Sequence, residues 1–197
     1  MKKVLKGTKG YLAYAKKKAL LWTIVLFMLS LGLFLTGYIS TGSKENYLTI
    51  VAVLGCLPAS RSLVNTIVKF RYHGISDEAF EKIDPHVQGM QTFCDLVFTS
   101  YEKNFEIHHM ALQGNTLIGY SSNQKCDAKA CEKHLHELFV KNGLRQIDIT
   151  IFKEMPKYVK RLDSLAADSE VECEAVVSQE QAAQNAEVAA LLEAISL

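Results

Sequence analysis

The sequence predicts an integral membrane protein in which a transmembrane helical hairpin precedes a small cytosolic α+β domain. Two long apolar segments lie within the first 70 of its 197 residues, and basic side chains flank them on one side. The rest of the chain alternates between helix-like and strand-like hydrophobic patterns. Charge divides in the same way, because residues 1–70 carry ten basic groups and one acid, whereas residues 71–197 carry 12 basic groups and 20 acids.

Residues 19–39 form the first predicted span, because they contain 21 consecutive uncharged residues. At ~1.5 Å per residue such a helix crosses a hydrocarbon core of ~30 Å. Trp22 and Tyr38 lie near its ends, where interfacial aromatic residues are enriched. A cleaved signal peptide is the alternative, but its apolar core is typically only about 7–15 residues long.

Residues 47–68 form the second predicted span, whose one charged residue is Arg61. Pro58 and Asn65 lie one turn to either side of it. One interpretation is a polar kink that faces a partner helix or a small water-filled recess. The other is an arginine on a tilted helix whose side chain extends to the membrane surface.

Gly55 and Ala59 are four residues apart in the second span and form a small-residue surface that permits close helix packing. The sequence therefore predicts that the hairpin, residues 19–70, associates with itself or with a partner protein through this helix.

The basic residues set the predicted orientation, because cytoplasmic flanks of spans are rich in Lys and Arg. Nine flank the spans on the side of the two termini and one, Lys44, lies in the link. We therefore expect a multi-pass protein of the cytoplasmic (inner) membrane with both termini in the cytoplasm and with reduced cysteines, including Cys173, in its cytosolic part. The basic flank consists of Lys2, Lys3, Lys6, Lys9, Lys16, Lys17, Lys18, Lys69 and Arg71.

Residues 1–18 form a basic cytoplasmic segment in which apolar and lysine residues alternate. An interfacial helix on anionic lipid is one interpretation, with Lys16, Lys17 and Lys18 at the headgroups. A plain positively charged flank is the other. Nucleic acid is not an expected partner, because residues 71–197 carry a net charge of −8 and would repel phosphate.

Residues 72–165 are expected to form the cytosolic α+β domain in the order α-β-β-α-β-α. Apolar residues from Val87 to Tyr101 recur every three or four positions and predict a helix over 85–103. Strands are predicted at 105–113, 116–122 and 145–153, and helices at 127–142 and from Pro156. Ser76, Asp127 and Gly143 are expected to cap or end helices, and Gly114-Asn115 to form a hairpin turn. Residues 166–197 are acidic and are predicted to be a mobile tail with a possible terminal helix, which could bind a partner.

Chemistry-bearing motifs are sparse. Phosphate-binding glycine loops, a G-x-S-x-G elbow and an HExxH motif are absent from the sequence. Cys126, Cys131 and His134 are ligand types for zinc, but their spacing favours a buried cysteine beside surface histidines, so no metal or other cofactor is expected. His108 and His109 are adjacent in a predicted strand and should therefore face opposite sides of the sheet.

Nuclease activity is disfavoured as well. The order of elements loosely resembles nuclease-like α/β cores, in which an acid on one strand and an acid-x-Lys pair on the next hold Mg²⁺. The predicted strand 116–122 contains no acid.

A binding or regulatory role follows as the expectation, with the cytosolic domain presented to a partner from the membrane. The alternative is a membrane-tethered enzyme of unrecognised class that uses His108 or His109 together with region 126–136. The two hypotheses differ in whether polar groups converge in a concave pocket.

Overall fold

The computed structural model describes residues 4–43, 45–100, 103–172 and 179–197. The chain divides into two compact units, one made of Leu12–Tyr72 and one that joins the N-terminal residues to His73–Leu197. Expectations for Lys2, Lys3, Lys44, Tyr101 and Cys173 lie outside the described residues.

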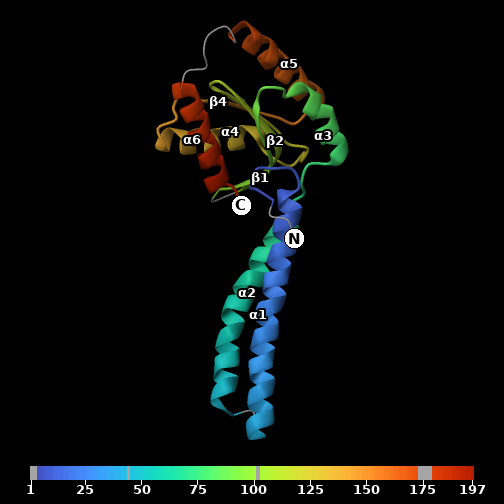
Figure 1. Ribbon diagram of the computed structural model, residues 1–197, viewed down its shortest axis with the longest axis vertical. Helices are drawn as coiled ribbons and strands as arrows, with labels where there is room; N and C mark the ends of the chain where they lie inside the picture. The colour runs from blue at the N-terminus through green and yellow to red at the C-terminus, as the bar shows by residue number, and fades with distance from the viewer. Residues whose placement is uncertain (1–3, 44, 101–102, 173–178) are drawn as a thin grey trace. The chain divides into compact units, whose positions relative to one another are not determined.

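The first unit is a pair of long apolar helices, α1 (Tyr11–Thr41) and α2 (Tyr47–Phe70) (Figure 1). Both are long and apolar enough to cross a membrane. Asn46 begins α2 by accepting a 2.8 Å hydrogen bond from the Thr49 amide. Pro58 lies inside α2 without interrupting it. Each helix extends beyond the predicted span, so Lys16–18 lie within α1 rather than before it.

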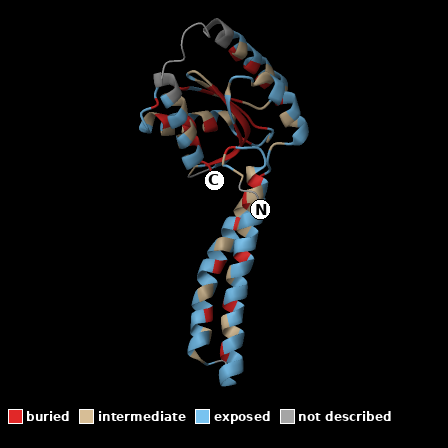
Figure 2. Cartoon of the chain, in the orientation of Figure 1, coloured by how far each residue is buried: buried red, intermediate tan, exposed pale blue. Residues whose placement is uncertain are grey.

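The two helices pack through small and polar residues seven positions apart. Figure 2 shows these buried positions as separate bands on otherwise exposed helices. A repeat of seven keeps one seam of each helix against the other, as in coiled coils. The buried residues along this seam are Thr23, Ser30 and Gly37 on α1 and Ala52, Ala59 and Thr66 on α2.

The second unit is built on a four-stranded mixed sheet. Its strands are β1 (Gln91–Thr99), β2 (Asn104–Gln113), β3 (Thr116–Tyr120) and β4 (Asp148–Phe152), in that spatial order. The first three pair antiparallel, and β4 runs parallel to β3. Helices cover both faces of this sheet.

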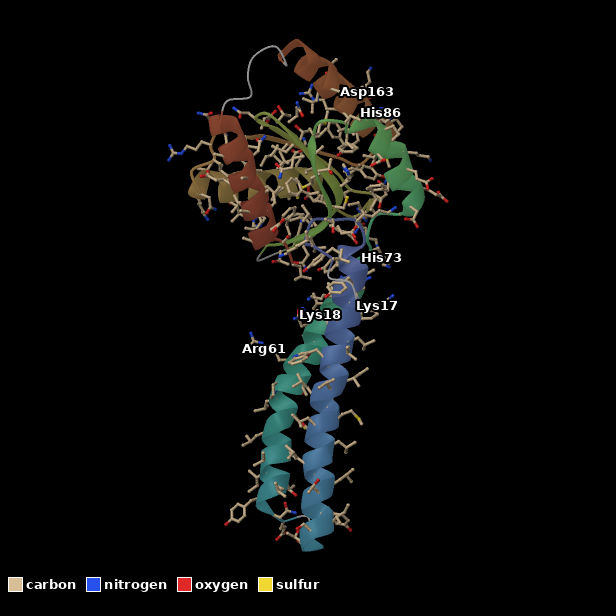
Figure 3. The ribbon with its side chains drawn as sticks, viewed as in Figure 1. Lys17, Lys18, Arg61, His73, His86 and Asp163 are labelled. Atoms are coloured by element: carbon tan, nitrogen blue, oxygen red, sulfur yellow. The ribbon has the colours of Figure 1, made fainter. Side chains whose placement is uncertain are left out.

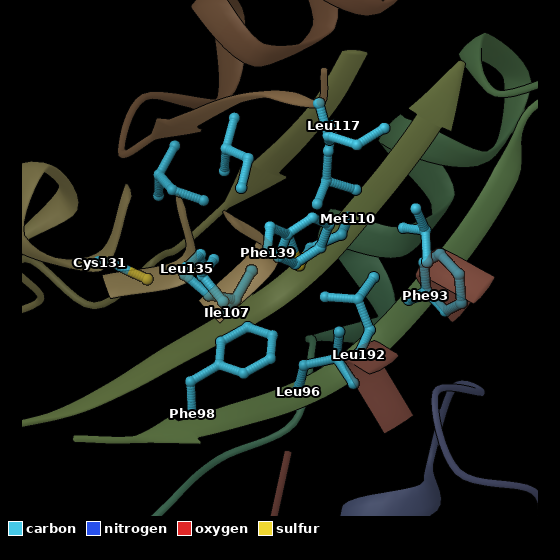
Figure 4. Packing of buried hydrophobic residues seen from close by; sticks show 14 of the residues in the cluster. Phe93, Leu96, Phe98, Ile107, Met110, Leu117, Cys131, Leu135, Phe139 and Leu192 are labelled. Atoms are coloured by element: carbon cyan, nitrogen blue, oxygen red, sulfur yellow. The ribbon is translucent and has the colours of Figure 1, made fainter. Parts of the chain in front are cut away.

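One face of the sheet packs against α4 (Ala128–Lys141) and α6 (Gln179–Ile195), with Leu135, Phe139 and Leu192 fully buried (Figure 4). The opposite face packs against α3 (Asp77–Ile83), the short 3₁₀ turn η1 (Asp84–His86) and α5 (Met155–Glu172). Ile83, Tyr158 and Leu162 form that second core with residues of β2 and β3. The unit is therefore a three-layer α/β structure.

Most predicted elements of this unit are confirmed. The bounds of strands β2, β3 and β4 and of helix α4, and the start of helix α5, fall within three residues of their predicted positions. Ser76 caps α3 and Asp127 caps α4 through their side-chain oxygens. Gly114 and Gly143 have φ values of 54° and 88°, in the left-handed region that the turn and the helix end require.

The predicted helix over 85–103 is wrong, because the structure forms η1 and then strand β1 there. Residues 93–98 are buried on both faces of the sheet, and such a strand loses the alternating pattern that marks a half-buried one. A kink at Asp95, where φ is 57°, also places Phe93 and Leu96 in the same core although they are three residues apart. That spacing imitates a helical stripe. Gly89, with φ of 79°, was the sequence signal against a continuous helix.

Both described ends of the chain pack on β1, which is an edge strand. Gly7 accepts a 2.6 Å hydrogen bond from the Cys94 amide, and the Leu197 amide donates to Val97 at 2.9 Å. Val188 and Leu192 of α6 are fully buried in the core. Within the predicted tail, residues 166–172 therefore continue α5, the possible terminal helix is present as α6 and packs on the sheet, and the N-terminal segment covers the sheet edge.

Candidate functional site

Four buried titratable side chains gather on the face of the sheet that carries α5. Asp95, Glu106, His108 and His109 are only 6, 8, 4 and 1% exposed. Charged groups are rarely buried to this extent unless each has partners, so the contacts of each one decide what the cluster can do.

His108 and His109 lie on the same face of the sheet, so the prediction that they face opposite sides is wrong. Ile107 and Met110 both belong to the core under α4, which leaves the two residues between them for the other face. The His109 ring lies 5.9 Å from that of Tyr158 in α5. The His108 ring lies 6.5 Å from Tyr120, which also contacts Tyr158. The break in alternation in β2 pairs with the kink at Asp95 in β1.

Asp95 holds together the two chain segments that flank the helical pair. Its Oδ1 accepts the Ile75 amide at 2.8 Å and its Oδ2 accepts the Gly10 amide at 3.0 Å. Gly10 directly precedes α1 and Ile75 follows α2. A Cβ at Gly74 would lie 2.9 Å from both carboxylate oxygens, so glycine permits this close approach.

Glu106, on the neighbouring strand β2, binds the segment that follows α2. Its Oε1 accepts the His73 amide, and its Oε2 accepts the side-chain amide of Asn123 at 3.0 Å. Ser121 donates a 2.6 Å hydrogen bond to the Glu106 carbonyl. Together the two carboxylates accept three backbone amides from residues 10, 73 and 75. We name Asp95 and Glu106 the junction carboxylates.

His108 and Ser122 do not form an activated nucleophile. The Ser122 amide donates to Nδ1 of His108 at 3.2 Å, so Nδ1 carries no proton. The proton of the neutral ring is therefore on Nε2, which lies 3.2 Å from the Ser122 hydroxyl and 3.9 Å from Glu106. Such a ring donates to the hydroxyl and cannot deprotonate it. Burial lowers the pKa of His108, which keeps the ring neutral.

His109 and Tyr158 form a buried pair with Nδ1 and the phenol oxygen 2.7 Å apart. Burial lowers the pKa of His109 to about 4 and raises the pKa of the Tyr158 phenol. Both groups are consequently neutral near pH 7, and the pair acts as a hydrogen-bonded element of the core.

The three metal-ligand candidates of region 126–136 do not come together. Cys126 and Cys131 are buried in the core under α4, and His134 packs its ring on Phe105 at 5.9 Å. Within the described residues, no group of three or more His, Cys, Asp and Glu side chains is arranged to hold a metal ion. His109 contacts α5 on the other face of the sheet, so the pairing of His109 with this region is not observed.

Acids on neighbouring strands, one part of the pattern that nuclease-like cores require, occur on β1 and β2 rather than on β3. Asp95 lies on β1, and Glu106 and His108 form an acid-x-His pair on β2. However, each of the four carboxylate oxygens already accepts a hydrogen bond from an amide of the chain. These contacts assign the carboxylates a structural role.

The polar residues singled out in the second span separate into two groups. Pro58, Arg61 and Asn65 are exposed, and Arg61 extends from the side of α2 that points away from α1 (Figure 3). Gly55 and Ala59 instead belong to the seam with α1. A Cβ at Gly55 would lie 2.8 Å from the Ser30 hydroxyl. The small-residue surface is therefore occupied within the chain.

The lysines predicted to contact lipid headgroups lie two turns into α1. Lys17 and Lys18 are exposed, and the Lys16 ammonium lies 5.7 Å from the Phe70 ring at the end of α2. Lys6 and Lys9 are bound within the second unit. Lys6 donates to the Ser196 carbonyl at 2.6 Å, and Lys9 pairs with Asp77 at 2.7 Å.

No protein-family model matches the chain, and no curated protein or solved structure shows significant similarity to it. The site therefore rests on its own geometry. The junction carboxylates were not among the residues predicted from the sequence, although Asp95 and Glu106 both interrupt apolar runs, which was the available signal.

Proposed function

We propose that this chain is a membrane-anchored binding or regulatory protein. In this proposal α1 and α2 cross the cytoplasmic membrane as a hairpin, both termini are cytoplasmic, and the α/β unit is presented to a protein partner. Nucleic acid is not the proposed partner, because residues 71–197 carry a net charge of −8.

The distribution of exposed apolar side chains carries the proposal. Among the described side chains, every exposed large apolar residue lies between Leu20 and Phe70, with Leu5 as the exception. Trp22 is 63% exposed and Ile39 is 80% exposed. Such a continuous apolar surface is incompatible with water and matches a hydrocarbon solvent. The described surface of residues 73–197 exposes no large apolar side chain, which suits an aqueous compartment.

The junction carboxylates support a regulatory element in this proposal. Asp95 and Glu106 fix the backbone at Gly10, His73 and Ile75, so the chain enters and leaves the hairpin at restrained points. These three residues belong to the α/β unit, so a change in the backbone at any of them would act on β1 and β2.

Topology is the first test. In a variant with Cys56, Cys94, Cys126, Cys131 and Cys173 replaced by Ala, a cysteine at Ser43 in the link should react with a membrane-impermeant maleimide on intact cells. A cysteine at His136, which is exposed on α4, should react only after lysis. Cys126 itself is unsuitable as the inner reporter, because it is only 5% exposed.

The opposite labelling pattern would contradict the proposed orientation, and recovery of the chain in the soluble fraction would contradict the anchor. For binding, partners captured from native membranes by the full chain should be lost with Asp95→Ala at a urea concentration that unfolds the α/β unit of this variant but not that of the parent. Partners retained by that variant would bind the hairpin instead.

A further inference from the structure

The hairpin has an apolar groove of about 560 Å³ between its two helices. We propose that this groove binds one anionic phospholipid, with an acyl chain along the groove and the phosphate beside Lys16 and Lys17. The inference rests on the proposed membrane location and orientation of α1 and α2. It deepens that proposal by naming the class of lipid that the hairpin selects and the lysine that selects it.

The groove suits an acyl chain in its chemistry and in its length. Apart from Thr23 and Ser30 its lining side chains are apolar, and the Thr23 hydroxyl is already bonded within the hairpin. Along α1 the lining runs from Leu20 to Phe34, which is about 21 Å of helix. One leaflet contributes about 15 Å to the hydrocarbon core, so the groove is long enough for the whole chain of one lipid.

Lys17 continues the α1 wall of the groove towards the cytoplasmic surface. The seam repeats every seven residues, so residues seven apart on α1 lie on one line along the helix. Lys17 is on the line of Ile24 and Leu31, which both line the groove. It is exposed and lies three residues before Leu20, the first groove residue of α1. Because Cβ atoms tilt towards the N-terminus of a helix, the Lys17 side chain extends from the groove towards the headgroups.

The α2 wall ends beside a second lysine. Phe70 follows Cys56 and Leu63 at the same spacing of seven, so it continues the line of these two lining residues to the end of α2. The Lys16 ammonium lies 5.7 Å from the centre of the Phe70 ring. Both Lys16 and Lys17 therefore lie at the cytoplasmic end of the groove.

These two lysines have no counter-charge in the helical unit. The one acid among residues 12–72 is Glu45, in the link at the other end of the helices. Among the described residues, no ion pair includes Lys16 or Lys17. An anionic lipid supplies the missing negative charge at this depth, whereas the phosphate of a zwitterionic lipid is accompanied by a cation of its own.

Charge also favours a lipid over a second copy of the chain in the groove. Two copies of the same orientation in a membrane are related by an axis along the membrane normal, so equal residues meet at equal depth. Contact through the groove would bring Lys16 and Lys17 of both copies together, and these like charges repel. An anionic lipid instead places opposite charge beside the same side chains.

Native mass spectrometry of the full chain tests the headgroup. The chain, purified in mild detergent, is mixed with equal amounts of phosphatidylglycerol and phosphatidylcholine that carry the same acyl chains. We expect each chain to retain one phosphatidylglycerol in preference to phosphatidylcholine. Lys17→Gln should weaken this preference about fivefold, which is the contribution of one lysine near an anionic surface.

Lys18→Gln is the matched control, because it removes the same charge one residue away. Lys18 is exposed and lies on the line of Val25 and Gly32, which are not among the lining residues. This variant should keep the preference of the parent. Equal losses from Lys17→Gln and Lys18→Gln, or equal retention of the two lipids by the parent, would overturn the proposed site.

A filling variant tests the acyl chain. Ile24→Trp places a large side chain in the groove and should lower the retention of phosphatidylglycerol. Val25→Trp should not, although Ile24 and Val25 are similarly exposed, at 50 and 48%. Equal retention by these two variants would overturn the groove as the binding site.

Two further outcomes separate this inference from the proposed function. Carbonate extraction of each variant, run in parallel, reports membrane insertion. A membrane-inserted parent that has the mass of two chains and no bound lipid would assign the groove to a second copy and overturn only the lipid site. Recovery of the parent in the soluble fraction would refute the membrane location and the inference together.

Discussion

The two units of the chain bury opposite kinds of side chain. Along the hairpin seam the buried residues are small or hydroxylic, and the large apolar side chains point outward. In the α/β unit the buried residues include Phe98, Phe139 and Tyr158, and the surface is polar. The difference follows from the solvent, because large apolar groups gain from burial only where water is the alternative. Hydrogen bonds should therefore also contribute different amounts to the free energy of unfolding in the two units.

Asp95→Ala should have the largest effect. It leaves the Gly10 and Ile75 amides without their acceptor and places alanine at a φ of 57°. Two unpaired amides cost about 1–3 kcal/mol each, and the left-handed backbone adds about 1 kcal/mol, so we expect a loss of roughly 3–7 kcal/mol. This loss is measured by urea unfolding of the α/β unit in the full chain in mild detergent, with pulse proteolysis as the readout of the folded fraction.

Two further variants isolate the cause. Asp95→Asn retains one acceptor oxygen and tolerates the left-handed backbone, so it should lose about half as much. Asp148→Ala removes an exposed aspartate of β4 and should stay within about 0.5 kcal/mol of the parent. A small effect of Asp95→Ala would show that the junction is held by packing rather than by this carboxylate.

Acid sensitivity of the α/β unit is the second prediction. The pKa of His109 is about 4 in the folded state against 6.5 for a free histidine. Above pH 6.5 the contribution of neutral His109 is fully present. As pH falls from 6.5 towards 4, the unfolded state binds a proton that the folded state excludes. Stability should therefore fall with pH by roughly 3 kcal/mol over this window.

The slope of unfolding free energy against pH is the measurement. His109→Phe combined with Tyr158→Phe replaces the hydrogen-bonded pair by apolar rings and should flatten this slope, apart from the share of His108, whose pKa is also lowered. The exposed His136→Gln should keep the parent slope. An unchanged slope in the double variant would place the acid sensitivity elsewhere in the chain.

The sequence alone was sufficient for elements that local chemistry determines. The two apolar spans, the Ser76 and Asp127 caps and the Gly114 turn need only a few neighbouring residues, and all were predictable. Strand β1 was not, because burial on both faces and the kink at Asp95 give a helix-like spacing of apolar residues.

The site was harder to predict from the sequence than the fold, for a physical reason. His108 and His109 were recognised, but their common face depends on paired irregularities in β1 and β2. The partners of Asp95 are 20 and 85 residues away along the chain, so no local pattern indicates them. Gly55 and Ala59 were predicted to permit close helix packing between chains, and the structure places them in the seam within the hairpin, because spacing cannot tell a partner in the same chain from one in another.

Thr23→Val should have the smallest effect and compares hydrogen bonds in the two units most directly. Thr23 contacts Ser62 at 2.7 Å and Thr66 at 3.0 Å across the hairpin seam. Hydrogen bonds between membrane helices contribute about 0.6 kcal/mol each, because the separated helices find other partners, so we expect a loss of about 1 kcal/mol. Unfolding in mixed micelles, followed by Trp22 fluorescence, measures it. Thr36→Val is the matched control, since its hydroxyl bonds only the Gly32 carbonyl among the described contacts and it is exposed. A loss as large as that of Asp95→Ala would mean that hydrogen bonds, rather than close packing of small residues, hold the hairpin together.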